Sequence, residues 1–72
     1  PELVREVLKV MEALGDQGMT MVVVTHEVGF ARNVASRVML FENGRVAEDS
    51  PPDRFFSDQA SERTHAFLEH VL

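Results

Sequence analysis

Residues 19–26 read Met-Thr-Met-Val-Val-Val-Thr-His, and this stretch decides the fold. Its apolar part, Met21 to Val24, is continuous and rich in β-branched residues. Such a run is typical of a strand that is buried on both faces, as in a parallel sheet between two layers of helices. We therefore predict a strand over residues 19–25. A strand of this kind needs neighbours on both sides, and the rest of the chain offers only one hairpin, so the pattern indicates the tail of a larger α/β domain.

A helix is predicted on each side of this strand. Before it, apolar residues recur at helical spacing between residues 2 and 14, and Gly15 and Gly18 mark the end of the helix. The apolar stripe consists of Leu3, Val7, Val10, Met11 and Leu14. After the strand, a second and shorter helical pattern is formed by Val28, Ala31, Val34 and Ala35.

The second half of the chain predicts a β-hairpin followed by helices. Residues 37–42 and 45–48 form the two strands, and Asn43-Gly44 between them is a strong type I′ turn signal. Pro51-Pro52 ends the second strand, because proline cannot donate to a strand ladder. A short helical turn begins at Phe55-Phe56, and the last helix runs from about residue 61 to 71. The apolar face of that helix would hold Phe67, Leu68, Val71 and Leu72. The predicted fold class is therefore α/β, in the order helix, buried strand, helix, β-hairpin and two C-terminal helices, as one unit over residues 1–72.

Composition excludes several classes of protein. The formal net charge of the 72 residues is −5, with no basic block, which disfavours nucleic-acid binding because that begins with neutralising phosphates. The absence of cysteine excludes disulfides and thiolate metal sites and fits a reducing compartment. The longest apolar run is too short to cross a bilayer. The chain opens on Pro1 without a basic and apolar leader, so we expect a processed, engineered or partial chain and no secreted precursor.

His26 is the main candidate for a functional residue. In open α/β sheets, ligands bind outside the carboxyl ends of the strands. His26 follows Thr25 at that end of the predicted buried strand, just before a helix. Its imidazole can donate one N–H to an anionic oxygen while a neighbour holds the other nitrogen. From position alone, a polar residue that merely happens to end a strand is the more common case.

Other candidate sites are weaker, and no metal site is predicted. The His26-Glu27 pair begins like a zinc-protease helix, but position 30 is Phe where a second histidine is needed. His65 and His70 are five residues apart, a rotation of about 140° on a helix, so they do not share a face and are expected to be solvated. The glycines match neither a dinucleotide fingerprint nor a phosphate loop, and no serine lies in a nucleophile elbow.

Two further clusters have a plain structural interpretation. Glu48, Asp49 and Asp53 surround the proline pair and are expected to lie in a solvated loop rather than to act in acid–base chemistry. Four apolar residues of the C-terminal part are expected in the core rather than in a partner-binding stripe: Phe55, Phe56, Phe67 and Leu68.

Residues 19–32, Met-Thr-Met-Val-Val-Val-Thr-His-Glu-Val-Gly-Phe-Ala-Arg, resemble the ATP-binding subunits of ABC transporters. The bacterial importers of polar amino acids are the subgroup that the residues resemble most. The resemblance continues through residues 37–45, Pro51-Pro52, Phe55-Phe56, Glu62-Arg-Thr64 and Phe67-Leu68, and so covers essentially the whole chain. It implies that residues 1–72 are the C-terminal part of an incomplete nucleotide-binding domain with a P-loop NTPase-like fold.

The resemblance also implies a role for His26. It matches the switch histidine of the family, which contacts the γ-phosphate of ATP, and would be both the catalytic and the nucleotide-binding residue of this segment. ATP and Mg²⁺ would serve the intact parent protein. The phosphate loop, the family signature and the catalytic glutamate would all precede Pro1. We therefore expect these 72 residues alone to hold no cofactor and to hydrolyse no ATP.

The implied partners are a transmembrane permease subunit and a second ATP-binding subunit, on the cytoplasmic face of the cell membrane. Two residues depart from the family pattern: Ser36 stands where Asp is common, and Ser50 where Gly is common, which puts the loop conformation there in doubt. The alternative is a free-standing α+β interaction module, or a regulatory module that binds a small anion at His26, without ATPase activity. The isolated chain is expected to associate by exchanging elements with a second copy, or to be only partly ordered.

Overall fold

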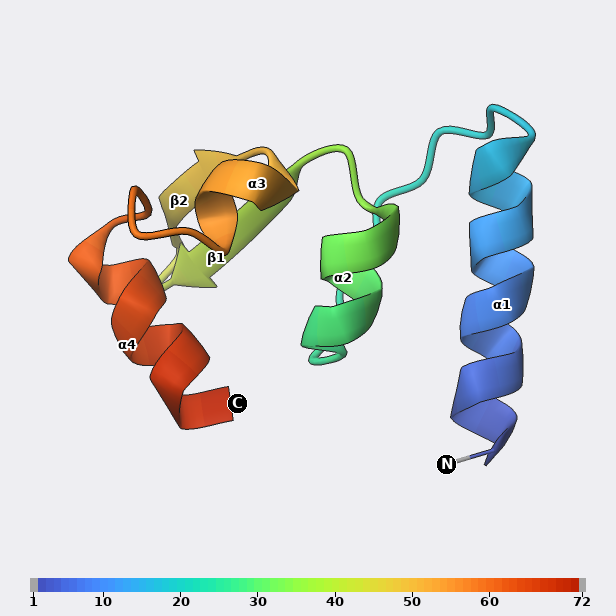
Figure 1. Ribbon diagram of the computed structural model, residues 1–72, viewed down its shortest axis with the longest axis horizontal. Helices are drawn as coiled ribbons and strands as arrows, with labels where there is room; N and C mark the ends of the chain where they lie inside the picture. The colour runs from blue at the N-terminus through green and yellow to red at the C-terminus, as the bar shows by residue number, and fades with distance from the viewer. Residues whose placement is uncertain (1, 72) are drawn as a thin grey trace.

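The structure, a computed structural model, describes residues 2–71. Two helices come first, α1 (Glu2–Asp16) and α2 (Val28–Val34). They are followed by the strands β1 (Val38–Glu42) and β2 (Arg45–Ser50) and by the helices α3 (Pro52–Phe55) and α4 (Glu62–Val71). Helices α3 and α4 lie against the hairpin, α1 stands at the far end of the molecule, and α2 lies between them (Figure 1).

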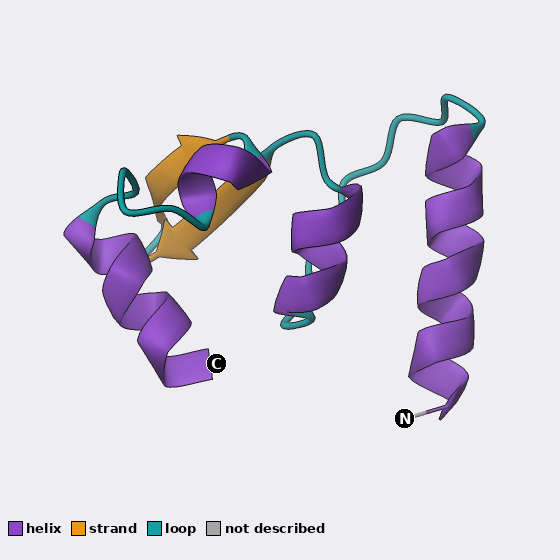
Figure 2. Cartoon of the chain, viewed as in Figure 1, coloured by secondary structure: helices purple, strands orange, loops and turns teal. Residues whose placement is uncertain are grey.

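The prediction of a strand over residues 19–25 is wrong. These residues form an irregular linker between α1 and α2 (Figure 2). A strand exists only where a neighbour pairs with its peptide groups, and the two strands within residues 2–71 pair with each other. Val22 and Val24 are consequently 95% and 98% exposed, although their sequence is that of a buried strand.

Helix α1 is confirmed, and it continues two residues beyond the predicted end. Gly18, at φ 91°, ends it: the Gly18 N–H donates to the Gly15 carbonyl at 2.9 Å, and the Met19 N–H donates to the Leu14 carbonyl at 3.2 Å. This pair of bonds is a Schellman motif, which requires the left-handed backbone that glycine adopts readily. The apolar stripe of the helix is largely uncovered, with Leu3 73% exposed.

The β-hairpin is confirmed, with both turn residues in the left-handed region, Asn43 at φ 53° and Gly44 at φ 74°. The register shifts between Leu40 and Phe41, so that one extra residue of β2 bulges out of the ladder. The second strand continues to Ser50, two residues further than predicted. Among residues 2–71, Asn43 alone has a positive φ without being glycine, so serine is unstrained at position 50.

The buried core is small and lies entirely in the C-terminal half. Within residues 2–71, the buried apolar residues are Leu40, Phe55 and Ala60, and neither α1 nor α2 contributes one. The prediction of a core position is confirmed for Phe55, which is 2% exposed, whereas the other three residues of that set are only half-buried. The radius of gyration is 12.7 Å, against about 11 Å for a compact domain of this length.

Helix α4 follows the prediction within one residue, whereas α3 ends at Phe55, where the helical turn was predicted to begin. Helix α3 begins at Pro52, earlier than predicted, because proline is pre-organised for the first turn of a helix. Helix α4 leaves Val71 partly exposed, and Leu72, assigned to its apolar face, lies outside the described residues. None of the helices within residues 2–71 is long and apolar enough to cross a membrane.

Replacing Gly44 by Ala is expected to lower the free energy of unfolding by about 1–2 kcal/mol, because a Cβ is strained at positive φ. The matched control is Gly29→Ala, in α2, where an added Cβ meets open space. That change is expected to leave stability unchanged or to raise it by up to about 1 kcal/mol. Urea unfolding followed by circular dichroism measures both, and equal losses in the two variants would contradict the turn assignment.

Candidate functional site

His26 lies in the bend that joins the linker to α2, and it is exposed. The Glu27 N–H donates to the Thr25 hydroxyl at 2.9 Å, which closes a tight turn around His26. Helix α2 begins two residues later at Val28. The imidazole is therefore accessible to solvent. The hydrogen bond between Glu27 and Thr25 holds the turn around it, and α2 starts just after it.

The position predicted for His26 needs a correction. The carboxyl end of a strand was expected, but the residues before His26 form no strand within the described chain. The helix start after Glu27 is present as predicted. Thr25, by contrast, belongs to a turn and not to the end of a strand. Two surface hollows flank α3, and His26 lines neither of them.

Glu48 is not in a solvated loop, contrary to the sequence interpretation. It lies in β2, and its carboxylate accepts hydrogen bonds from the Ser61 N–H at 2.8 Å and the Thr64 hydroxyl at 2.9 Å. Because the single Thr64 hydroxyl proton is used on Glu48, the Ser61 hydroxyl must donate to Thr64 Oγ1, at 3.0 Å. The Thr64 N–H in turn donates to Ser61 Oγ at 3.2 Å. Glu48 thus completes the cap of α4.

The hydrogen bonds from the Ser61 N–H first, and then from the Thr64 hydroxyl, lower the pKa of the Glu48 carboxyl to about 2. Thr64 is fully buried, so this cap joins the helix to the sheet. The signal in the sequence was Ser61 followed three residues later by a polar residue at the start of a helix, which resembles a capping box. The carboxylate that completes this cap is that of Glu48, in the distant strand β2. Periodicity within one segment of sequence does not reveal such a partner.

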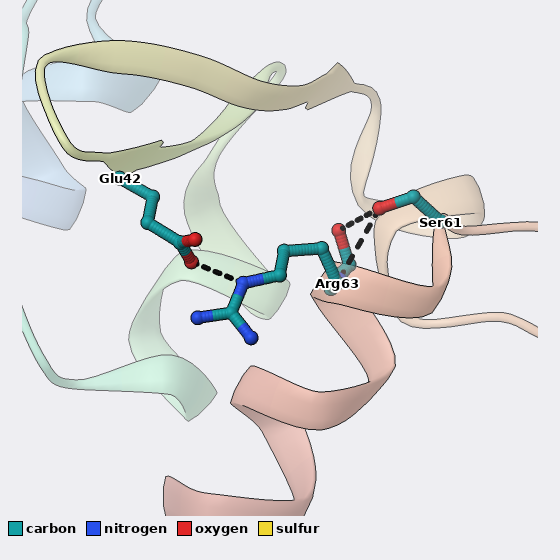
Figure 3. A network of polar contacts seen from close by, with 4 residues as sticks. Glu42, Ser61 and Arg63 are labelled. Carbon is teal, nitrogen blue, oxygen red and sulfur yellow. Dashed lines mark hydrogen bonds and ion pairs between the residues drawn. The ribbon is translucent and has the colours of Figure 1, made fainter.

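Two ion pairs tie the same unit together. Arg37, just before β1, donates two hydrogen bonds to Asp49 of β2, one of them at 2.6 Å. Hydrogen bonding to Arg37 lowers the pKa of the Asp49 carboxyl. Arg63 of α4 reaches Glu42 at the end of β1, next to the Ser61 cap (Figure 3). Asp49 therefore lies in a strand and is paired rather than in a loop, although it is exposed as expected. Asp53 is also exposed, but it lies in α3 and not in a loop.

The two C-terminal histidines differ from each other. His65 is half-buried, and its Nε2 donates to the Ser57 carbonyl at 2.9 Å, so the expectation that it is solvated is wrong. His70 is exposed, as expected. Within residues 2–71, no group of three or more His, Cys, Asp or Glu side chains could hold a metal ion.

No protein-family model matches the chain. Over its whole length, however, the chain is homologous to a segment of the ATP-binding subunits of amino-acid ABC transporters. This finding confirms the resemblance drawn from residues 19–68.

Among these relatives are the glutamate/aspartate import ATP-binding protein GltL of Escherichia coli K12, which is 54% identical, and the glutamine transport ATP-binding protein GlnQ of Geobacillus stearothermophilus, which is 53% identical. The arginine transport ATP-binding protein ArtM of Bacillus subtilis is 51% identical. Each match covers all 72 residues of this chain. The chain spans only about 30% of the length of each relative.

Acid is expected to release α4 from the hairpin through Glu48. Its pKa in the folded chain, about 2, lies below the ordinary value of 4.5, so its stabilising effect is complete above pH 4.5 and is lost as the pH falls toward 2. Glu48→Gln should lower stability at neutral pH and flatten the loss between pH 4.5 and 2. The matched change at exposed Glu69 should do neither. Unfolding midpoints measured across this pH range decide, and an unaltered acid profile in Glu48→Gln would contradict the assigned cap.

Proposed function

We propose that these 72 residues are the C-terminal segment of the ATP-binding subunit of an amino-acid importer of the ABC class, a subunit that hydrolyses ATP. The observation that carries the proposal is the match over the entire chain, at 51–54% identity, to ATP-binding proteins for glutamate, glutamine and arginine transport. Because the matches to three of these relatives cover all 72 residues, they favour a retained role over a piece of the fold that serves another function. The transported solute of this protein is left open by relatives with such different substrates.

In this proposal His26 is the switch residue that contacts the γ-phosphate of ATP. Its exposure and the turn between Thr25 and Glu27 support that role, because an accessible imidazole held at a bend can donate an N–H to a phosphate oxygen. Phosphoryl transfer depends on positioning and on stabilising developing charge. His26 would contribute one such contact when ATP is bound.

The described residues fit a contact to ATP but do not fit the Mg²⁺ site. The imidazole of His26 is available, whereas residues 2–71 contain no cluster of ligands for a cation. Nor does the sequence contain a glycine-rich phosphate loop. The phosphate cradle and the Mg²⁺ ligands therefore belong, in this proposal, to the remaining 70% or so of a protein the length of its relatives. The 72 residues by themselves would be inert.

The exposed apolar surface supports the proposal that this segment completes its fold only within a larger protein. Val22 and Val24 are almost fully exposed, and the stripe on α1 is open. In the parent protein, a permease and a second ATP-binding subunit would be the partners, at the cytoplasmic face of the membrane. The isolated chain would instead associate with a second copy or order only in part.

The alternative remains a free-standing interaction or regulatory module without ATPase activity. Its support is that β1, β2, α3 and α4 enclose a core of their own around Phe55. The coding sequence before Pro1 distinguishes the two. Continuation in frame into a glycine-rich phosphate loop establishes the transporter subunit, whereas a start codon at or near Pro1 establishes the module.

Replacing His26 by Ala in the full-length parent is expected to depress the rate of ATP hydrolysis by a factor of about 100 or more, which is typical for the loss of one group from a preorganised charged site. Nucleotide affinity, measured by titration calorimetry, should change little. His70→Ala, an exposed histidine of α4, is the matched control and should leave both quantities unchanged. Parallel losses of rate and affinity in His26→Ala would indicate a general structural role instead.

A further inference from the structure

A stack of an arginine on an aromatic ring links α2, the helix that follows His26, to the C-terminal core. The Arg32 guanidinium lies over the ring of Phe56, 5.6 Å from its centroid, which is the geometry of a cation–π interaction. Arg32 is in the last turn of α2, and Phe56 is the C-cap residue that follows α3. The two helices are in contact at this point.

Phe56 is itself held by the core. Its ring lies 5.0 Å from that of Phe55, centroid to centroid, at an angle of 60°, which is a favourable tilted arrangement for two aromatic rings. Phe55 is 2% exposed and so cannot shift without disturbing the core. Phe56 therefore has a fixed neighbour in Phe55, and the Arg32 guanidinium packs over the Phe56 ring.

Helix α2 is only partly covered by the rest of the described chain. None of its residues is buried, and Glu27, the N-cap residue just before Val28, makes no side-chain hydrogen bond to the helix. At its C-terminal end, a three-residue link joins it to β1, whose start is tied to β2 by Arg37 and Asp49. The Arg32–Phe56 stack is a through-space contact between α2 and the C-terminal unit that adds to this covalent link. It lies about one helical turn from the start of α2.

We propose that Arg32 and Phe56 are positioning residues for His26: their stack orients α2 against the C-terminal unit and thereby sets where the imidazole stands. The inference rests on the proposed function of His26 and adds to it. Neither Arg32 nor Phe56 touches the nucleotide in this account. The C-terminal unit acts on hydrolysis only through the orientation of α2.

The test uses the full-length parent with two disruptive and two conservative variants. Arg32→Gln and Phe56→Leu remove the stack, whereas Arg32→Lys keeps the cation and Phe56→Tyr keeps the ring. Arg45→Gln, at an exposed arginine beside the hairpin turn, is the control for loss of charge. Hydrogen exchange of residues 26–34 reports on the orientation and stability of α2, and steady-state hydrolysis reports on kcat and KM.

The disruptive variants are expected to exchange about two to five times faster over residues 26–34, as befits a cation–π contact at an exposed site. Their kcat should fall with KM for ATP nearly unchanged, and both readouts should return in Arg32→Lys and Phe56→Tyr. Arg45→Gln should behave like the parent.

Unchanged exchange over residues 26–34 in both disruptive variants would overturn the inference, whatever the hydrolysis rate does. Faster exchange with an unaltered kcat would also overturn it, provided that His26→Ala is impaired. If His26→Ala itself hydrolyses ATP at the parental rate, the proposed function of His26 fails first, and the positioning role fails with it.

Discussion

The structure depends on a shortage of hydrogen-bond partners at its most apolar segment. No backbone–backbone hydrogen bond is made by residues 20–26 within the described chain, although Met21 to Val24 has the composition of a buried strand. A peptide group that is neither paired in a ladder nor buried is left to water, so the segment stays irregular. The valine side chains are exposed for the same reason. No backbone pairing therefore holds the segment between α1 and α2 in a fixed form within the described chain.

In the C-terminal half, by contrast, backbone and polar side-chain groups pair with one another. The hairpin pairs its two strands, Phe55 fills the space beneath α3, and three carboxylates bind groups from other elements. Each of these carboxylates uses a different partner: Asp49 an arginine, Glu42 another arginine, and Glu48 the N-terminus of α4. The exposed pairs contribute little each, so the buried cap at Thr64 and the small apolar core are the main sources of order.

Sequence reasoning located most elements because their signals are local. The helical stripe of α1, the Asn43-Gly44 turn and the proline pair all act over a few residues, and the structure has these features within two or three positions. The strand over 19–25 failed because strand formation is decided by a neighbour, which no local pattern supplies. Glu48 was misjudged for a related reason, since its partners lie 13 and 16 residues away in the sequence. His26 is a candidate because of its predicted position and the resemblance, and the structure adds only that it is exposed.

Amide hydrogen exchange at residues 21–25 tests the central claim most directly. It should be measured in the 72-residue chain and again in a protein that continues upstream of Pro1 to the length of the relatives. Our account predicts rapid exchange in the short chain, as a monomer, and strong protection in the long one, where neighbouring strands pair with this segment. Equally rapid exchange in both proteins, or strong protection in the monomeric short chain, would contradict it.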